Sequence, residues 1–90
     1  MSKVRTATEV DVFVGAQLKF LRKSAGLSQT EFANQVGVTF QQIQKYERGA
    51  NRIGASRLWS LCQVFNVKPG RFFDGVEQHI AKAKSKSSAD

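Results

Sequence analysis

The stretch Leu27–Gly49, LSQTEFANQVGVTFQQIQKYERG, contains two helix starts in close succession. The first is marked by Ser28 and Glu31, which have the S-x-x-E spacing of a capping box. Leu27 and Phe32 flank it at the spacing of a hydrophobic staple, which fixes how the chain enters a helix. The pattern therefore predicts that a helix begins directly after Ser28.

The second helix start repeats the same device a few residues later. Thr39 and Gln42 form a T-x-x-Q capping box, and Val38 and Ile43 form its staple. Gly37 stands just before them, where glycine can adopt the left-handed conformation that ends a helix. One short helix, at about 29–36, is therefore expected to end and another, at about 40–48, to begin within a few residues.

A sequence that predicts two helices joined by such a tight turn is typical of a helix-turn-helix. The second helix projects from the bundle, so its outer face is free to enter a DNA major groove, which is about 12 Å wide. The exposed positions expected on this helix are Phe40, Gln41, Gln44, Lys45 and Arg48. Glutamine amides can pair with adenine, lysine suits guanine acceptors or phosphate, and an aromatic ring can touch a thymine methyl. The alternative is a polar surface that serves solubility alone.

The composition fits one small domain with a polyanionic partner. Ninety residues with 41% apolar side chains can form one modest core, which leaves little room for a deep active site. Fourteen Lys and Arg against seven Asp and Glu give a net charge of +7, although a basic protein without a nucleic-acid partner stays an alternative. Neither glycine-rich phosphate motif occurs, so we expect no enzyme and no catalytic residue.

Other sequence signals are mostly negative. Cys62 is the only cysteine and His79 the only histidine, so we expect no disulfide framework, no metal site and no cofactor. The chain has neither a signal-peptide pattern nor an 18-residue apolar run. A cytoplasmic protein that does not enter a membrane is therefore predicted.

The remaining pattern predicts an all-α fold of five short helices. Apolar residues at helical spacing start after a plausible N-cap at Asp11, and Gly26, Gly49 and Asn66 can end helices. The expected helices span about 12–25, 29–36, 40–48, 55–65 and 69–74. The domain organisation is predicted as a disordered arm at 1–10, a helix-turn-helix domain at 11–75, and a short helical extension with a disordered basic tail at 76–90.

Inward faces follow from the same periodicity. Val14, Leu18, Leu21 and Ala25 share one face of the first helix. The other residues expected to point inward are Phe32, Ala33, Val36, Ile43, Tyr46 or Glu47, Leu58, Leu61, Cys62 and Phe65.

Contacts to the DNA backbone are expected from residues around the reading helix. Ser28 and Gln29 lie at a helix N-terminus, where free N–H groups and the helix dipole favour an anion. Arg48, Asn51 and Arg52 lie in a following loop that can track phosphates, unless they are only solvated. The full predicted phosphate set is Ser28, Gln29, Thr39, Arg48, Asn51 and Arg52.

Apolar residues in the C-terminal part exceed what so small a core needs. Trp59 lies one step off the buried stripe of its helix, and further apolar residues follow it. Either they complete the core or they form a homodimer interface, and we expect the interface. Its predicted members are Trp59, Phe72, Phe73, Val76 and Ile80.

The stretch from Leu27 to Gly49 closely resembles the helix-turn-helix of the Cro/lambda-repressor-like, or Xre-type, transcriptional regulators. The resemblance covers about Val14 to Phe73, and the segments L-S-Q and Y-E-R-G are its most specific parts. The run A-N-R-I-G-A-S-R-L after T-F-Q-Q is similar to a subgroup of short bacterial regulators. The resemblance implies a compact five-helix lambda-repressor-like DNA-binding domain that dimerises on palindromic operators.

By position, the resemblance implies roles for individual residues. Base-reading sites fall on Phe40, Gln41 and Lys45, with Gln44 as a plausible addition. Arg22 and Glu47 match a pair that forms an ion pair between the first and third helices of relatives. Phe40 departs from the polar residue of the well-known phage repressors, so its ring is expected to pack on a thymine methyl or a sugar edge instead.

The sequence therefore predicts a bacterial regulator that binds double-stranded DNA sequence-specifically, as a homodimer and repressor. No separate domain for a small-molecule effector is expected. The alternative function is an antitoxin-like protein-interaction module that neutralises a partner through Trp59 and the C-terminal helix and regulates its own operon.

Overall fold

The computed structural model describes residues 2–88 of the chain, with side-chain detail for residues 9–84. It contains α1 (Ser2–Ser24), α2 (Gln29–Val36), α3 (Phe40–Glu47), α4 (Ala55–Phe65), a 3₁₀ helix η1 (Pro69–Phe73) and α5 (Val76–Ser88). No strand occurs within residues 2–88, so the all-α prediction is confirmed. The predicted bounds of α2 and α4 match, and those of α3 and η1 differ by one residue.

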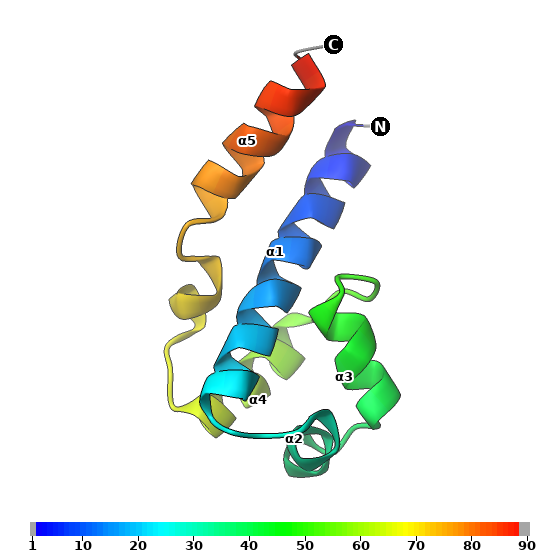
Figure 1. Ribbon diagram of the computed structural model, residues 1–90, viewed down its shortest axis with the longest axis vertical. Coiled ribbons are helices and arrows are strands. Elements are labelled where there is room, and N and C mark those ends of the chain that lie inside the picture. Colours follow the sequence, from blue (N-terminus) through cyan, green and yellow to red (C-terminus); the bar gives the residue numbers. More distant parts are fainter. Residues whose placement is uncertain (1, 89–90) are drawn as a thin grey trace.

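The helices are arranged around α1, which runs along the long axis of the molecule (Figure 1). Helix α1 packs against α3, α5 and η1, whereas α2 packs against α3 and α4. Helices α2, α3 and α4 surround the C-terminal half of α1, and α5 returns along its N-terminal half (Figure 1). Within the described residues, no helix is both long enough and apolar enough to span a membrane.

The first helix begins earlier than the sequence pattern predicts. Residues 2–10, expected to be a disordered arm, form the first turns of α1, and Met1 lies outside the described residues. Asp11 is not an N-cap but lies inside α1, where its Oδ2 accepts a hydrogen bond from Arg52 Nε at 3.2 Å. Residues 2–10 contain no glycine or proline, and extending an existing helix costs little once its nucleus has formed. The helix therefore continues toward the N-terminus alongside α5.

The C-terminal segment also differs from its prediction. Helix α5 reaches Ser88, so most of the segment expected to be a disordered basic tail is helical. Residues 89 and 90 lie outside the described part of the chain. The contact of α5 with α1 supplies packing that the local sequence pattern does not reveal.

The core lies where α1, α2, α3, α4 and η1 meet. Most of the predicted inward residues are confirmed as buried or partly buried, whereas Ala25 is exposed. The fully buried side chains are Leu18, Phe32, Ile43, Leu61, Cys62 and Phe72. Burial raises the pKa of the Cys62 thiol, which keeps it neutral in this core.

Phe72 corrects one member of the predicted homodimer interface. Its side chain has no exposed surface and belongs to the core, so it is unavailable to a second copy of the chain. The neighbouring residue Phe73 is 40% exposed. In the short η1 helix, consecutive aromatic rings point to opposite environments, and only the tertiary contacts decide which ring faces inward.

Candidate nucleic-acid interface

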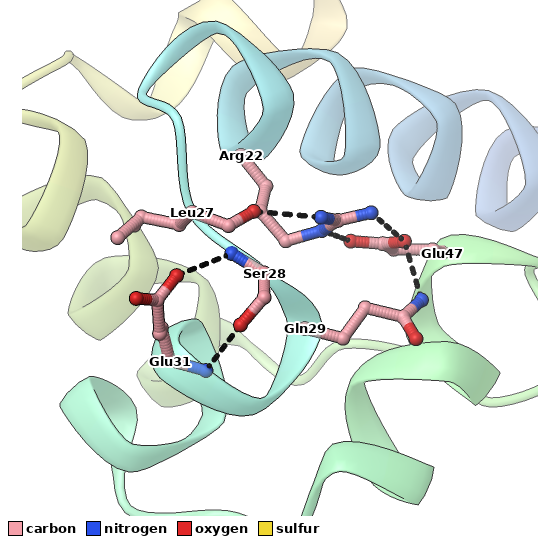
Figure 2. Close-up of polar contacts among 6 residues, drawn as sticks. All are labelled: Arg22, Leu27, Ser28, Gln29, Glu31 and Glu47. Carbon is pink, nitrogen blue, oxygen red and sulfur yellow. Dashed lines mark hydrogen bonds and ion pairs between the residues drawn. The ribbon is translucent and has the colours of Figure 1, made fainter.

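The entry into α2 contains the predicted capping box in full. The Glu31 backbone N–H donates to Ser28 Oγ at 3.0 Å, and the Ser28 backbone N–H donates to Glu31 Oε1 at 2.8 Å (Figure 2). Hydrogen bonding to Ser28 lowers the pKa of Glu31 below its usual value. The Ser28 backbone makes the larger contribution and the Ser28 side chain the smaller one. Helix α2 ends as expected at Gly37, which is left-handed with φ of 76°.

The entry into α3 contains half of the second predicted box. The Gln42 backbone N–H donates to Thr39 Oγ1 at 3.1 Å. Among the described residues, no return hydrogen bond from the Thr39 backbone N–H to the Gln42 side-chain oxygen occurs. The cap still fixes the direction in which the chain enters α3, with Thr39 extended at φ −79° and ψ 158°.

Helix α3 presents one continuous exposed face. Ile43, Tyr46 and Glu47 are buried, whereas four other residues of α3 and the C-cap residue that follows it are exposed. A helix turns by about 100° per residue, so these five occupy a contiguous arc of roughly 140°. We call them the outer face of α3: Phe40, Gln41, Gln44, Lys45 and Arg48. The predicted base-reading residues and Arg48 therefore share one surface.

The polar side chains of this outer face are unpartnered within the described part of the chain. Gln41, Gln44, Lys45 and Arg48 make no side-chain hydrogen bond or ion pair there. The outer face carries two cations and no carboxylate. Its donors and acceptors are consequently available to a ligand with a mixed pattern of donors, acceptors and negative charge.

The inner surface of α3 is held by a polar network (Figure 2). Arg22 Nε donates to Glu47 Oε2 at 2.6 Å and Arg22 Nη2 donates to Glu47 Oε1 at 3.2 Å. Both side chains are more than 90% buried, so the predicted ion pair is present and shielded from water. Arg22 Nη1 also donates to the Leu27 carbonyl at 2.8 Å. The network therefore joins α1 and α3 to the turn before α2.

Gln29 belongs to the same network. Its Nε2 donates to Glu47 Oε1 at 3.0 Å, which ties the first residue of α2 to the end of α3 (Figure 2). The sequence predicts a phosphate contact for Gln29. The structure adds a second role, since this hydrogen bond links the start of α2 to the end of α3.

Glycine permits the close approach of α1 and α3. A Cβ added at Gly15 would lie 2.8 Å from the Glu47 carbonyl oxygen and closer still to that of Tyr46. A Cβ at Gly49 would lie 2.6 Å from Val12 Cα. Gly15 was not predicted from the sequence, because a glycine inside a helix indicates a close contact only when the opposing helix is known.

A polar hollow lies beside the outer face of α3. It is lined by Lys19, Gln29, Gln44, Glu47 and Arg48, and its carboxylate is already paired with Arg22. Lys19 was not among the predicted contacts. Lys19 lies three residues before Arg22 on α1, and residues at this spacing share one side of a helix. Because the sequence had placed Arg22 in contact with the third helix, it also indicated that Lys19 faces that helix.

The predicted phosphate-contact residues at the end of α3 and in the following loop differ from one another in exposure and in partners. Arg48 is exposed and Asn51 is partly buried. Arg52 is exposed, and its Nε pairs with Asp11 Oδ2 at 3.2 Å. The Asp11 carboxylate offsets part of the Arg52 charge, and such an exposed pair contributes at most about 1 kcal/mol.

The remaining candidates for the homodimer interface are apolar residues on three helices. Trp59 of α4 is 60% exposed and Phe73 of η1 is 40% exposed, whereas Val76 and Ile80 of α5 are partly buried. Helix α4 packs on η1, and α5 packs on α1. The structure therefore leaves apolar surface on the C-terminal elements, with Trp59 as its most exposed side chain.

Comparison with known proteins identifies the class of this domain. A family model described as helix-turn-helix matches residues 18–72, which is more than half of the chain. The chain therefore belongs to the helix-turn-helix family that the sequence resemblance indicated. The matched region contains the whole α2–α3 unit and the core residues from Leu18 to Phe72.

Individual relatives agree with this family. An uncharacterized HTH-type transcriptional regulator of Sinorhizobium medicae is 46% identical over 65 residues, 72% of this chain and 47% of the relative. The antitoxin PezA of Streptococcus pneumoniae is 37% identical over 54 residues, 60% of this chain and 34% of PezA. The chain thus matches about half of the first relative and about a third of the second.

A solved structure supports the fold. The restriction-modification controller protein C.AhdI of Aeromonas hydrophila superposes with a TM-score of 0.65 at 27% identity, covering 69% of this chain and 94% of that protein. The lambda-repressor-like architecture predicted from the sequence is therefore confirmed at the level of the fold.

Proposed function

We propose that this protein binds double-stranded DNA by placing the outer face of α3 in the major groove. The observation that carries the proposal is the outer face itself, a continuous surface of unpartnered amides and cations without a carboxylate. Gln41, Gln44 and Lys45 have the donors and acceptors that read base edges. Membership of a family whose relatives are named transcriptional regulators supports the same function.

The phosphate contacts flank that face. Ser28 and Gln29 lie at the N-terminus of α2 and Thr39 at that of α3. Arg48 is the last residue of the outer face, and Asn51 and Arg52 follow it along the chain. We add Lys19, because it lines the same hollow as Gln29 and Arg48. These contacts fix the register of the protein on the duplex, and α3 supplies the sequence preference.

The protein is proposed to act as a homodimer on a two-fold symmetric operator and to repress by occupying promoter DNA. Trp59, Phe73, Val76 and Ile80 are the candidate dimer contacts, with Phe72 removed from the set because it is buried. Pairing two helix-turn-helix units sets half-sites about one helical turn apart, roughly 34–36 Å.

Selection of the purified protein against a random duplex pool tests this function. The pool is sequenced after binding at physiological salt. Enrichment of a symmetric motif with half-sites about one turn apart supports a dimeric groove reader. Nonspecific, salt-sensitive retention without any enriched motif contradicts sequence-specific reading by this chain.

Phosphate contacts are tested separately by salt dependence. Lys19→Ala should weaken all duplexes alike and reduce the slope of log K against log salt by about 0.9, the value expected when one phosphate is no longer neutralised. Arg52→Ala should act in the same direction but less, because Asp11 already pairs with its guanidinium. A changed base preference in Lys19→Ala contradicts a backbone role.

A second candidate function is an antitoxin-like interaction module that also binds its own promoter. The similarity to PezA and the exposure of Trp59 favour it. Co-expression with the product of the adjacent gene tests it. A stable complex that Trp59→Ala disrupts supports the module, whereas independent elution of both proteins contradicts it.

A further inference from the structure

Phe40 is an exposed aromatic ring on an otherwise polar face. It is the first residue of α3 and is 41% exposed. The other apolar residues of α3, Ile43 and Tyr46, are buried in the core, whereas Phe40 is absent from the core and from the apolar residues packed on it. Apolar surface left in water is unfavourable, so this ring gains free energy when a ligand covers it.

The position of Phe40 in α3 places it where base edges are read. In a helix-turn-helix, the N-terminal residues of the second helix make the base contacts. The Thr39 cap, with its hydrogen bond of 3.1 Å from the Gln42 backbone, fixes the chain at this point. Phe40 and Gln44 are one turn apart and therefore neighbours on the outer face. Phe40 thus stands beside a residue proposed to read bases.

The chemistry of a benzyl side chain restricts what it can read. It has neither the donor nor the acceptor needed to pair with a purine edge or with the cytosine amino group. The apolar group that base pairs present in the major groove is the C5-methyl of thymine. A 5-methylcytosine carries a methyl group on the same ring carbon.

We propose that Phe40 makes this protein a reader of a pyrimidine C5-methyl group, whether the pyrimidine is thymine or 5-methylcytosine. The inference rests on the proposed function, since it requires α3 to lie in the major groove. It assigns to one position of the binding site a preference for methylated over unmethylated pyrimidine, independently of the hydrogen-bonding pattern of the base pair.

The test uses the duplex enriched from the random pool, remade with uracil replacing thymine one position at a time. At the contacted position, uracil should lower the affinity about fourfold, the value expected for one buried methyl group. At the same position, a pair containing 5-methylcytosine should bind better than one containing cytosine by a similar factor. Affinity is measured by fluorescence anisotropy at fixed salt.

Two variants connect the effect to this side chain. Phe40→Ala should bind the thymine and uracil duplexes with nearly equal affinity, and its circular dichroism should match that of the parent because the ring lies outside the core. Phe20→Ala is the matched control, since it removes an exposed ring from α1 and should keep the fourfold ratio.

The outcomes separate this proposal from the proposed function. Failure to enrich any duplex removes the proposed function and the methyl-reading inference together. Specific binding that ignores uracil at every position, or a thymine preference that survives in Phe40→Ala, overturns the methyl reading and leaves the groove-reading function intact. The second result would indicate that the ring packs on the sugar edge or serves another role.

Discussion

The inner and outer sides of α3 differ in whether their polar side chains have partners within the protein. On the inner side, Glu47 is buried and accepts hydrogen bonds from Arg22 and Gln29, and Gly15 of α1 lies in close contact with the backbone. On the outer side, the polar side chains make no hydrogen bond within the described part of the chain. The comparison shows how a small domain can hold one side of a helix through buried contacts while leaving the polar side chains of the other side without internal partners.

The largest expected loss of stability comes from removing the buried carboxylate on the inner side of α3. Glu47→Ala leaves Arg22 buried without an anion and removes the acceptor of Gln29. The free energy of unfolding should fall by about 3–5 kcal/mol, as measured by urea denaturation. Asp11→Ala removes an exposed ion pair and should cost at most about 1 kcal/mol. Equal losses in the two variants contradict the positioning role of the buried pair.

The next effect concerns the close approach of α1 and α3. Gly15→Ala places a methyl group against the backbone carbonyls of α3, so the helices must separate. A decrease of about 1–3 kcal/mol in unfolding free energy is expected from such overpacking. Gly70→Ala is the control, since the added methyl meets open space. If thermal unfolding midpoints of both variants equal that of the parent, the two helices are packed more loosely than the structure shows.

The outer side is tested by Gln41→Ala. Removing this amide should leave the stability almost unchanged, because the side chain is exposed and unpartnered. Discrimination between the selected base pair and its alternatives should fall by about 1–3 kcal/mol in competition binding. A variant with an unchanged base preference would exclude Gln41 from base reading, and one with reduced stability would contradict the separation of the two sides.

The smallest expected effect lies at the cap of α2. Because the folded-state pKa of Glu31 is lowered, its stabilising contribution is present above the ordinary value of 4.5 and is lost as pH falls through the lowered pKa. Glu31→Gln should therefore be less stable than the parent at neutral pH, with the difference vanishing in acid. Denaturation across a pH series measures this. A difference that persists in acid shows that the cap acts without the carboxylate charge.

Features fixed by neighbouring residues were predictable from the sequence. The cap at Ser28, the left-handed exits at Gly37 and Asn66, and the bounds of α2 depend on chemistry within one helical turn. The outer face of α3 followed from helical periodicity in the same way. The Arg22–Glu47 pair came from the family resemblance, and the structure contains it.

Features fixed by distant contacts were not predictable. Helices α1 and α5 pack against each other, and this contact joins segments far apart in the sequence. The burial of Phe72 beside the exposed Phe73 depends on how η1 meets the core. The role of Gly15 emerges only when α1 and α3 are placed together, since no local pattern marks it, whereas the spacing of Lys19 from Arg22 already indicated the side of α1 that Lys19 faces.

Mapping the bound duplex onto the chain by backbone amide chemical shifts tests the central claim most directly. The isotope-labelled protein is titrated with the duplex enriched from the random pool, at physiological salt. We predict that the largest shifts fall on residues 40–48 and at the N-terminus of α2, with little change in α4 and α5 beyond the dimer contacts. Shifts concentrated around Trp59 and α5, with α3 unperturbed, would contradict a reading role for the outer face of α3.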